Sequence, residues 1–184
     1  MHIVAIPGAL RAGSFNLRLA KAAAARAPAG HTIEVATIHG VPLYDGDEEA
    51  KNGIPAPVTA LKDKVAAADG LLLVSPEYNG GIPGVMKNAI DWMSRPPADM
   101  ARVFEGKPVG IIGATPGPAG TRLAQTAWLQ TLRVLTAVPY FGRGLYVDSA
   151  AKVFDEAGAI LDPKTDERLR AYLEGFVAFV AKLR

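Results

Sequence analysis

The chain of 184 residues contains no cysteine. Disulfide bonds, thiolate metal sites and a cysteine nucleophile are therefore excluded. The three histidines, His2, His31 and His39, lack the spacing of a metal-binding motif, so we predict no metal site. No apolar run approaches the roughly 20 residues of a membrane span, and the opening residues HIVAIPG favour a core strand over a signal peptide. We therefore expect a cytoplasmic protein without a membrane partner.

An excess of charge of either sign is also missing. The chain has 20 Lys and Arg against 18 Asp and Glu, a net charge of +2, and the basic residues are scattered along it. This pattern argues against a nucleic-acid partner. Apolar residues make up 49%, as in an ordinary globular protein. A chain of this length suits a single domain spanning residues 1–184.

Apolar runs alternate with helical patterns along the chain. Strands are predicted at His2–Ile6, Thr32–Ile38, Gly70–Ser75, Lys107–Ala114 and, more weakly, Pro139–Val147. Helices are predicted at Asn16–Arg26, Pro57–Ala68, Pro83–Arg95, Thr121–Ala137 and Asp166–Leu183. Continuous apolar strands that alternate with helices indicate a parallel sheet covered on both faces. We predict an α/β fold, a flavodoxin-like three-layer sandwich whose five-stranded parallel sheet has the order 2-1-3-4-5.

In such a sheet, ligands bind outside the carboxyl ends of the strands, which directs attention to the loop PGALRAGSFN (7–16). Arg11 brings positive charge, and Ser14 and Asn16 can cap the helix that follows. Ser14 stands where a Walker lysine would be, and no dinucleotide fingerprint is present, so neither a nucleoside triphosphate nor a tightly bound dinucleotide fits. A phosphate at a helix N-terminus fits; a capped helix with a solvated Arg11 is the alternative.

The stretch SPEYNGGIPGVMKNAIDWMSR (75–95) places polar groups at the end of a buried strand. Its glycines leave backbone groups accessible to a planar heterocycle, Asn79 can hydrogen bond to a ring edge, and Tyr78 can pack against a ring. A polar loop with a stacked aromatic side chain is the alternative. Pro83 is expected at the first helical position. The helix carries an apolar stripe expected in the core or at a subunit interface: Ile82, Met86, Ile90 and Met93.

Together, GALRAGSFN and SPEYNGGIPGVMKNAIDWMSR resemble the NAD(P)H-dependent FMN reductases, a flavodoxin-fold group that includes quinone, chromate and azo-dye reductases. The resemblance extends over nearly the whole chain and includes PLYDGD (42–47). It implies FMN as cofactor and NADPH or NADH as hydride donor. Two electrons would then pass to a small-molecule acceptor of the quinone, free flavin, azo, nitro or chromate type. The resemblance also implies a homodimer or homotetramer, for which Trp92 and Met93 are candidate interface residues.

Carried over by position, the resemblance implies the cofactor contacts, none of which is strictly catalytic. The FMN phosphate and ribityl chain would contact Arg11, Ser14, Phe15 and Asn16. The isoalloxazine would lie against Pro76, Glu77, Tyr78, Asn79 and Gly80, with Thr115 and Gly117 of the third loop, ATPGPAG (114–120), beside it. The family commonly has serine where this chain has Ala9, which predicts weaker binding of FMN. The carboxylate of Glu77 either orders its loop or faces a partner subunit.

Two other functions stay open at this point. A flavodoxin-type electron carrier without NAD(P)H turnover of its own would share the fold, although such carriers tend to be strongly acidic. A hydrolase with Ser14 as nucleophile would need a histidine base, and the G-x-S-x-G elbow is missing. For a donor with a 2′-phosphate, the candidate partners are Arg95, Arg102 and Arg122.

Overall fold

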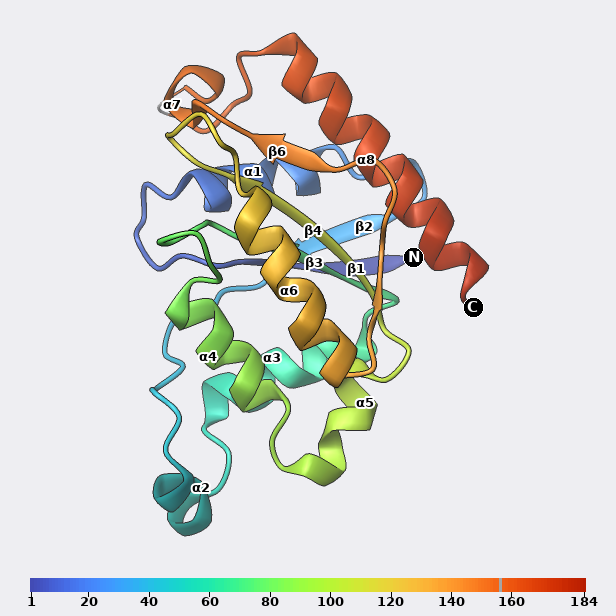
Figure 1. The fold of residues 1–184 in the computed structure, drawn as a ribbon. Coiled ribbons are helices and arrows are strands. Elements are labelled where there is room, and N and C mark those ends of the chain that lie inside the picture. Colours follow the sequence, from blue (N-terminus) through green and yellow to red (C-terminus); the bar gives the residue numbers. More distant parts are fainter. Residues whose placement is uncertain (156) are drawn as a thin grey trace.

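The computed structural model describes residues 1–155 and 157–184. A parallel sheet lies at its centre (Figure 1). Its strands are, in spatial order, β2 (Thr32–Val35), β1 (His2–Pro7), β3 (Gly70–Val74), β4 (Pro108–Ala114) and β5 (Val138–Pro139). The predicted order 2-1-3-4-5 is confirmed, and all of these pairs are parallel.

The predicted fifth strand is divided into two short pieces. β5 pairs with the start of β4, whereas β6 (Leu145–Val147) pairs with its end. The sheet therefore has six strands rather than five. The break coincides with two glycines over which tyrosine rings fold. A Cβ at Gly142 would lie 2.0 Å from Tyr140, and one at Gly144 would lie 2.4 Å from Tyr146.

Helices cover both faces of the sheet, which confirms the three-layer prediction (Figure 1). One face carries α1 (Phe15–Ala25), α7 (Ala150–Val153) and α8 (Pro163–Lys182). The other carries α3 (Ala56–Ala67), α4 (Gly84–Met93), α5 (Met100–Phe104) and α6 (Arg122–Val134). Alternate residues of a strand point to opposite faces, so Ile3 belongs to the first core and Val4 to the second.

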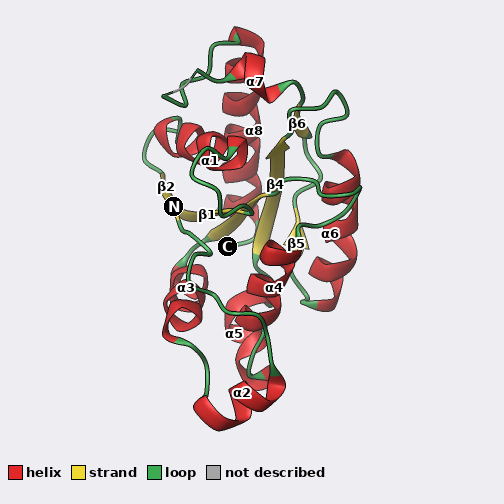
Figure 2. Ribbon diagram, turned by 90° about the vertical axis from the view of Figure 1, so that its left-hand side faces the viewer, coloured by secondary structure: helices red, strands yellow, loops and turns green. Residues whose placement is uncertain are grey.

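Several elements escaped prediction because they lack an apolar period. α2 (Gly46–Asn52) lies inside a predicted loop, has no buried residue, and begins with three acidic side chains after its cap Asp45. It projects away from the sheet, at the opposite end of the molecule from α7 (Figures 1 and 2). The 3₁₀ helix η1 (Pro97–Asp99) and α5 were also not predicted. Among the described residues, no helix has the length and apolar character needed to cross a membrane.

The apolar stripe of α4 belongs to the core. Met86, Ile90 and Met93 are buried against the second face of the sheet, and Trp92 is buried as well. Met93 and Trp92 therefore offer almost no surface to a partner subunit. Pro83 precedes the helix at the N-cap rather than occupying its first position.

A pair of buried hydrogen bonds joins α1 to the end of β4. Asn16 Nδ2 donates to the carbonyl oxygen of Ala114 (2.8 Å), and the Ala114 N–H donates to Asn16 Oδ1 (2.9 Å). Asn16 is 3% exposed and Ala114 is 2% exposed. Because water has little access to these groups, losing the amide would leave both backbone groups of Ala114 unsatisfied.

We predict that Asn16→Ala lowers the free energy of unfolding by about 3 kcal/mol, because each unsatisfied buried group costs about 1–3 kcal/mol. Asn88→Ala is the matched control. Asn88 also bonds two backbone groups, the Tyr44 N–H (2.9 Å) and the Pro42 carbonyl (2.7 Å), but in an exposed setting where water can replace it. Chemical denaturation of both variants measures the difference. Equal losses would contradict the structural role given to Asn16.

Candidate functional site

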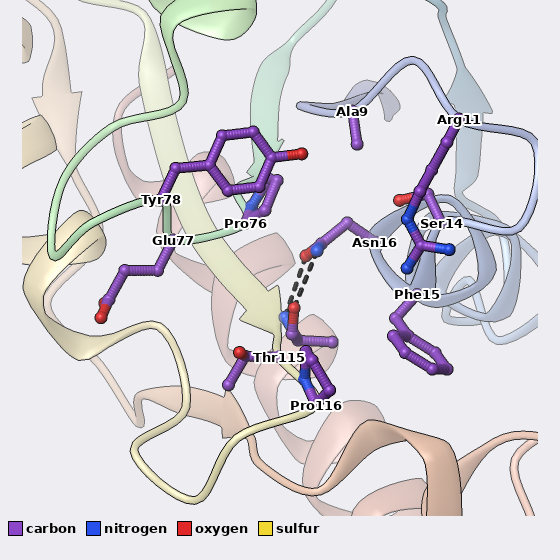
Figure 3. Close-up of a pocket in the computed structure, with 11 residues that line it drawn as sticks. Ala9, Arg11, Ser14, Phe15, Asn16, Pro76, Glu77, Tyr78, Thr115 and Pro116 are labelled. Atoms are coloured by element: carbon purple, nitrogen blue, oxygen red, sulfur yellow. Dashed lines mark hydrogen bonds between the residues drawn. The ribbon is translucent and has the colours of Figure 1, made fainter.

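A pocket opens at the carboxyl ends of β1, β3 and β4, where three loops meet (Figure 3). Its walls are formed by Ala9, Arg11, Ser14, Phe15, Asn16, Pro76, Glu77, Tyr78, Ala114, Thr115 and Pro116. The pocket thus gathers every predicted site residue except Asn79, Gly80 and Gly117. Ala114 and Pro116 were not predicted, because a backbone edge and a proline ring carry no motif of reactive side chains.

The first wall is the N-terminus of α1. Ser14 is its N-cap, buried, and Ser14 Oγ accepts a hydrogen bond from the Leu17 N–H (3.3 Å). The N–H groups of Phe15 and Asn16, in the first turn, have no acceptor within the helix. They add to the positive end of the helix dipole. This wall is therefore suited to bind an anion.

Arg11 adds a full positive charge to this wall. Its Nη1 donates to the Gly13 carbonyl (2.8 Å), and its guanidinium lies 5.4 Å from the centre of the Phe15 ring. In residues 1–155 and 157–184, no carboxylate forms an ion pair with it. The buried methyl group of Ala9 faces the pocket beside it (Figure 3). The residue at which this chain has alanine where the family commonly has serine therefore lines the pocket.

The second wall contains a tight turn. Tyr78 and Gly81 exchange both backbone hydrogen bonds (3.1 and 3.0 Å), and between them Asn79 and Gly80 have φ values of 51° and 73°. Two positive φ angles in a two-residue turn define type I′, for which Asn-Gly is the preferred sequence. Asn79 and Gly80 are therefore exposed at the tip rather than lining the pocket. The NG pair was the sequence signal for this turn.

Glu77, in the second loop, caps α6, the helix that follows the third loop. Its Oε2 accepts hydrogen bonds from the N–H groups of Leu123 (2.9 Å) and Ala124 (3.0 Å), at the start of α6. The residue before that helix, Thr121, does not cap it, because its hydroxyl accepts from Gln125 Nε2 instead (2.9 Å). A carboxylate at this end also complements the helix dipole.

Figure 3 shows the Glu77 side chain directed away from Arg11 and Ser14, while the Tyr78 ring extends across the pocket. The sequence left open whether the Glu77 carboxylate orders its loop or faces a partner subunit. The structure shows that it orders the loop. The carboxylate ties the second loop to α6 within one chain.

The third wall is fixed through its backbone. The Thr115 N–H donates to the Val147 carbonyl (2.9 Å), which holds the end of β4 beside β6. Gly117 lies outside the pocket, where its carbonyl accepts from the Ser149 N–H (3.1 Å). Thr115 therefore reaches the site directly, whereas Gly117 shapes the loop behind it.

The three arginines considered for a 2′-phosphate differ in their partners. Arg95 pairs with Glu49 (2.9 Å) and lowers the pKa of that carboxyl. Arg102 pairs with Asp99 (2.6 Å) and with a second carboxylate. Arg122 instead lies over the Tyr146 ring, 4.1 Å from its centre, and no carboxylate of the described chain pairs with it.

A hydrolase with Ser14 as nucleophile would need a histidine base beside that serine. In the described part of the chain, no histidine hydrogen bonds to Ser14. His39 is the histidine that touches the first loop, where its Nε2 bonds to the Leu10 carbonyl (2.8 Å) and so supports the loop rather than activating a nucleophile.

Comparisons with known proteins point the same way. The family model for NADPH-dependent FMN reductase matches residues 1–152. An NAD(P)H-dependent FMN reductase from Pseudomonas aeruginosa is 41% identical over 184 residues, covering 100% of this chain and 97% of that protein. A 2-hydroxy-1,4-benzoquinone reductase from a Burkholderia species is 36% identical, with 100% and 98% covered.

Solved structures include a similar fold with related sequence. The flavoenzyme NAD(P)H:acceptor oxidoreductase from Paracoccus denitrificans superimposes with a TM-score of 0.87 at 31% identity, over 98% of this chain and 97% of that one. The family expected from the two sequence motifs is therefore confirmed. The chain belongs to the NADPH-dependent FMN reductase family, whose members are oxidoreductases that use FMN and NAD(P)H.

Proposed function

We propose that the pocket binds FMN with its phosphate at the N-terminus of α1, and that the protein is an NAD(P)H-dependent quinone reductase. The observation that carries this proposal is the asymmetry of the walls. One wall gathers Arg11, Ser14 and the open first turn of α1, whereas the opposite wall offers the Tyr78 ring and Pro76. An anionic tail and a flat ring system at its other end fit these two walls.

The residues of the first wall would act differently on the phosphate. Arg11 would form a charge-assisted hydrogen bond, which is about twice as strong as a neutral one. The oxygen of Ser14 already accepts from Leu17, which leaves its hydroxyl hydrogen free to donate. The side-chain amide of Asn16 donates through its nitrogen to the Ala114 carbonyl and accepts through its oxygen from the Ala114 N–H. We therefore assign Asn16 the task of holding the wall in place, rather than that of a main phosphate ligand.

Bound FMN would supply the hydride chemistry, so that NAD(P)H, a quinone and one proton yield NAD(P)⁺ and a hydroquinone. The protein residues supply position and polarity. If the first and second walls hold the two ends of FMN as proposed, donor and acceptor would share the open side beside Tyr78 and bind in turn. Such sharing supports a ping-pong mechanism. The names of the relatives, FMN reductase and quinone reductase, agree with this chemistry.

We further propose a broad acceptor range that includes free flavins and azo, nitro and chromate-type compounds, and a cytoplasmic homodimer or homotetramer. The exposed ring of Tyr78 beside the pocket, which can contact a flat acceptor without a specific polar group, supports the acceptor range. The rival function, a flavodoxin-type carrier without NAD(P)H turnover, is not favoured by the net charge of +2. Among the three candidate arginines, we propose Arg122 as the partner of a donor 2′-phosphate, because Arg95 and Arg102 already form ion pairs with carboxylates.

Replacing Arg11 tests the orientation of the cofactor. We expect Arg11→Ala to raise the Kd of FMN about tenfold, which corresponds to about 1.4 kcal/mol. Riboflavin lacks the phosphate, so its Kd should not change. Arg133→Ala, an exposed arginine at the far end of α6, is the control and should leave both affinities unaltered. Flavin fluorescence titration measures them. An equal loss for FMN and riboflavin would refute the phosphate contact.

Steady-state kinetics tests the reaction itself. With NADPH and 1,4-benzoquinone varied together, we expect parallel double-reciprocal lines, because the two substrates share one site and never bind at once. Intersecting lines would contradict a shared site. An FMN-loaded protein that oxidises no NADPH would favour the carrier function instead.

A further inference from the structure

Two large exposed side chains, Tyr78 and Leu123, flank the turn at residues 78–81, and we call this pair the rim. Tyr78 is 48% exposed and lines the pocket, and Leu123, in the first turn of α6, is 61% exposed. The turn at residues 78–81 links them, because Tyr78 begins it and Leu123 lies against its tip. A Cβ at Gly80 would lie 3.4 Å from Leu123 Cδ1, so the leucine packs against the tip of the turn that carries the tyrosine.

This rim is held rigidly although it is exposed. The carboxylate of Glu77, the residue before Tyr78, binds the N–H groups of Leu123 and Ala124. The type I′ turn then closes directly after Glu77 through the pair of hydrogen bonds between Tyr78 and Gly81. The Glu77 side chain thus joins the turn that carries Tyr78 to the first turn of α6, which carries Leu123, although the two segments are far apart in the sequence.

Stability does not account for Leu123. The side chain belongs to neither core cluster of the described chain, and an exposed leucine gains little hydrophobic free energy. Polar side chains are common at the start of a helix, where they accept hydrogen bonds from N–H groups. In α6 the carboxylate of Glu77, which lies in a different loop, accepts these hydrogen bonds instead. Neither helix capping nor core packing therefore requires a leucine at residue 123. An apolar side chain near an aromatic ring is suited to contact a flat apolar molecule.

We propose that Leu123 is a specificity-determining residue of the acceptor site. Leu123 and Tyr78 would together set a preference, within the broad acceptor range proposed above, for planar apolar acceptors of the quinone class over hydrophilic oxidants. Glu77 is the positioning residue that sets this rim. The inference rests on the proposed reductase function and adds the acceptor preference to it.

The test compares two acceptors in the FMN-loaded protein: 2-methyl-1,4-naphthoquinone, which is planar and apolar, and ferricyanide, a hydrophilic anion. We expect Leu123→Ala to lower the ratio of their kcat/KM values about tenfold, mainly through a higher KM for the quinone, as when an apolar contact of a few methylene groups is lost. Leu161→Ala is the matched control. Leu161 is 60% exposed and lies just before α8, which covers the opposite face of the sheet from α6, so that variant should keep the ratio of the unaltered protein.

Glu77→Gln separates positioning from a general loss of structure. The neutral amide caps α6 less well, so we expect the acceptor ratio to fall in this variant too. If Glu77 acts through Leu123, its substitution should not lower the ratio further in the Leu123→Ala background, which a double-mutant cycle measures. Additive effects would overturn the positioning role.

The remaining outcomes separate this inference from the proposed function. Equal losses for both acceptors, or the same ratio in Leu123→Ala as in the unaltered protein, would overturn the rim while leaving the reductase function intact. If the FMN-loaded protein reduced neither acceptor with NADPH, the proposed function itself would fail, and the inference with it.

Discussion

The pocket depends first on the buried pair of hydrogen bonds between Asn16 and Ala114. Asn16 belongs to the helix whose N-terminus forms the anion-binding wall, and Ala114 ends the strand that leads into the third wall. A single amide therefore sets the position of one wall relative to another across the carboxyl edge of the sheet. Both partners are almost completely buried, so the contact resists competition from water, and two flexible loops can form one site.

A second tie crosses the site in the same way. Glu77, in the loop after β3, caps α6 behind the third wall. The first tie is made by a neutral amide under the pocket and the second by a carboxylate at its rim. Their combined effect is a site whose walls are fixed before any ligand binds, which reduces the entropy cost of binding. Positive charge is concentrated at Arg11 and the start of α1, while the Tyr78 side of the pocket is left for a ring.

The sequence predicted the sheet order and the three loops that meet at the pocket, because parallel strands and their flanking helices have strong periods. It did not predict α2, whose residues are nearly all exposed, or the divided edge strand, which breaks where Gly142 and Gly144 lie against tyrosine rings. At the site, residue types identified Arg11 and Ser14. The structure places Asn79 at a turn tip outside the pocket lining, because its φ is positive. The role of Glu77 was left open, since its partners are backbone N–H groups 46 and 47 residues away.

We propose that the pocket of this chain binds FMN so that NAD(P)H and an acceptor use its open side in turn. Anaerobic mixing of the FMN-loaded protein with one equivalent of NADPH tests it most directly. We expect the visible flavin absorbance to bleach and then to return when a quinone is added in a second mixing step. Absorbance that persisted with NADPH present, or a bleached protein that failed to recover with quinone, would refute this use of the pocket.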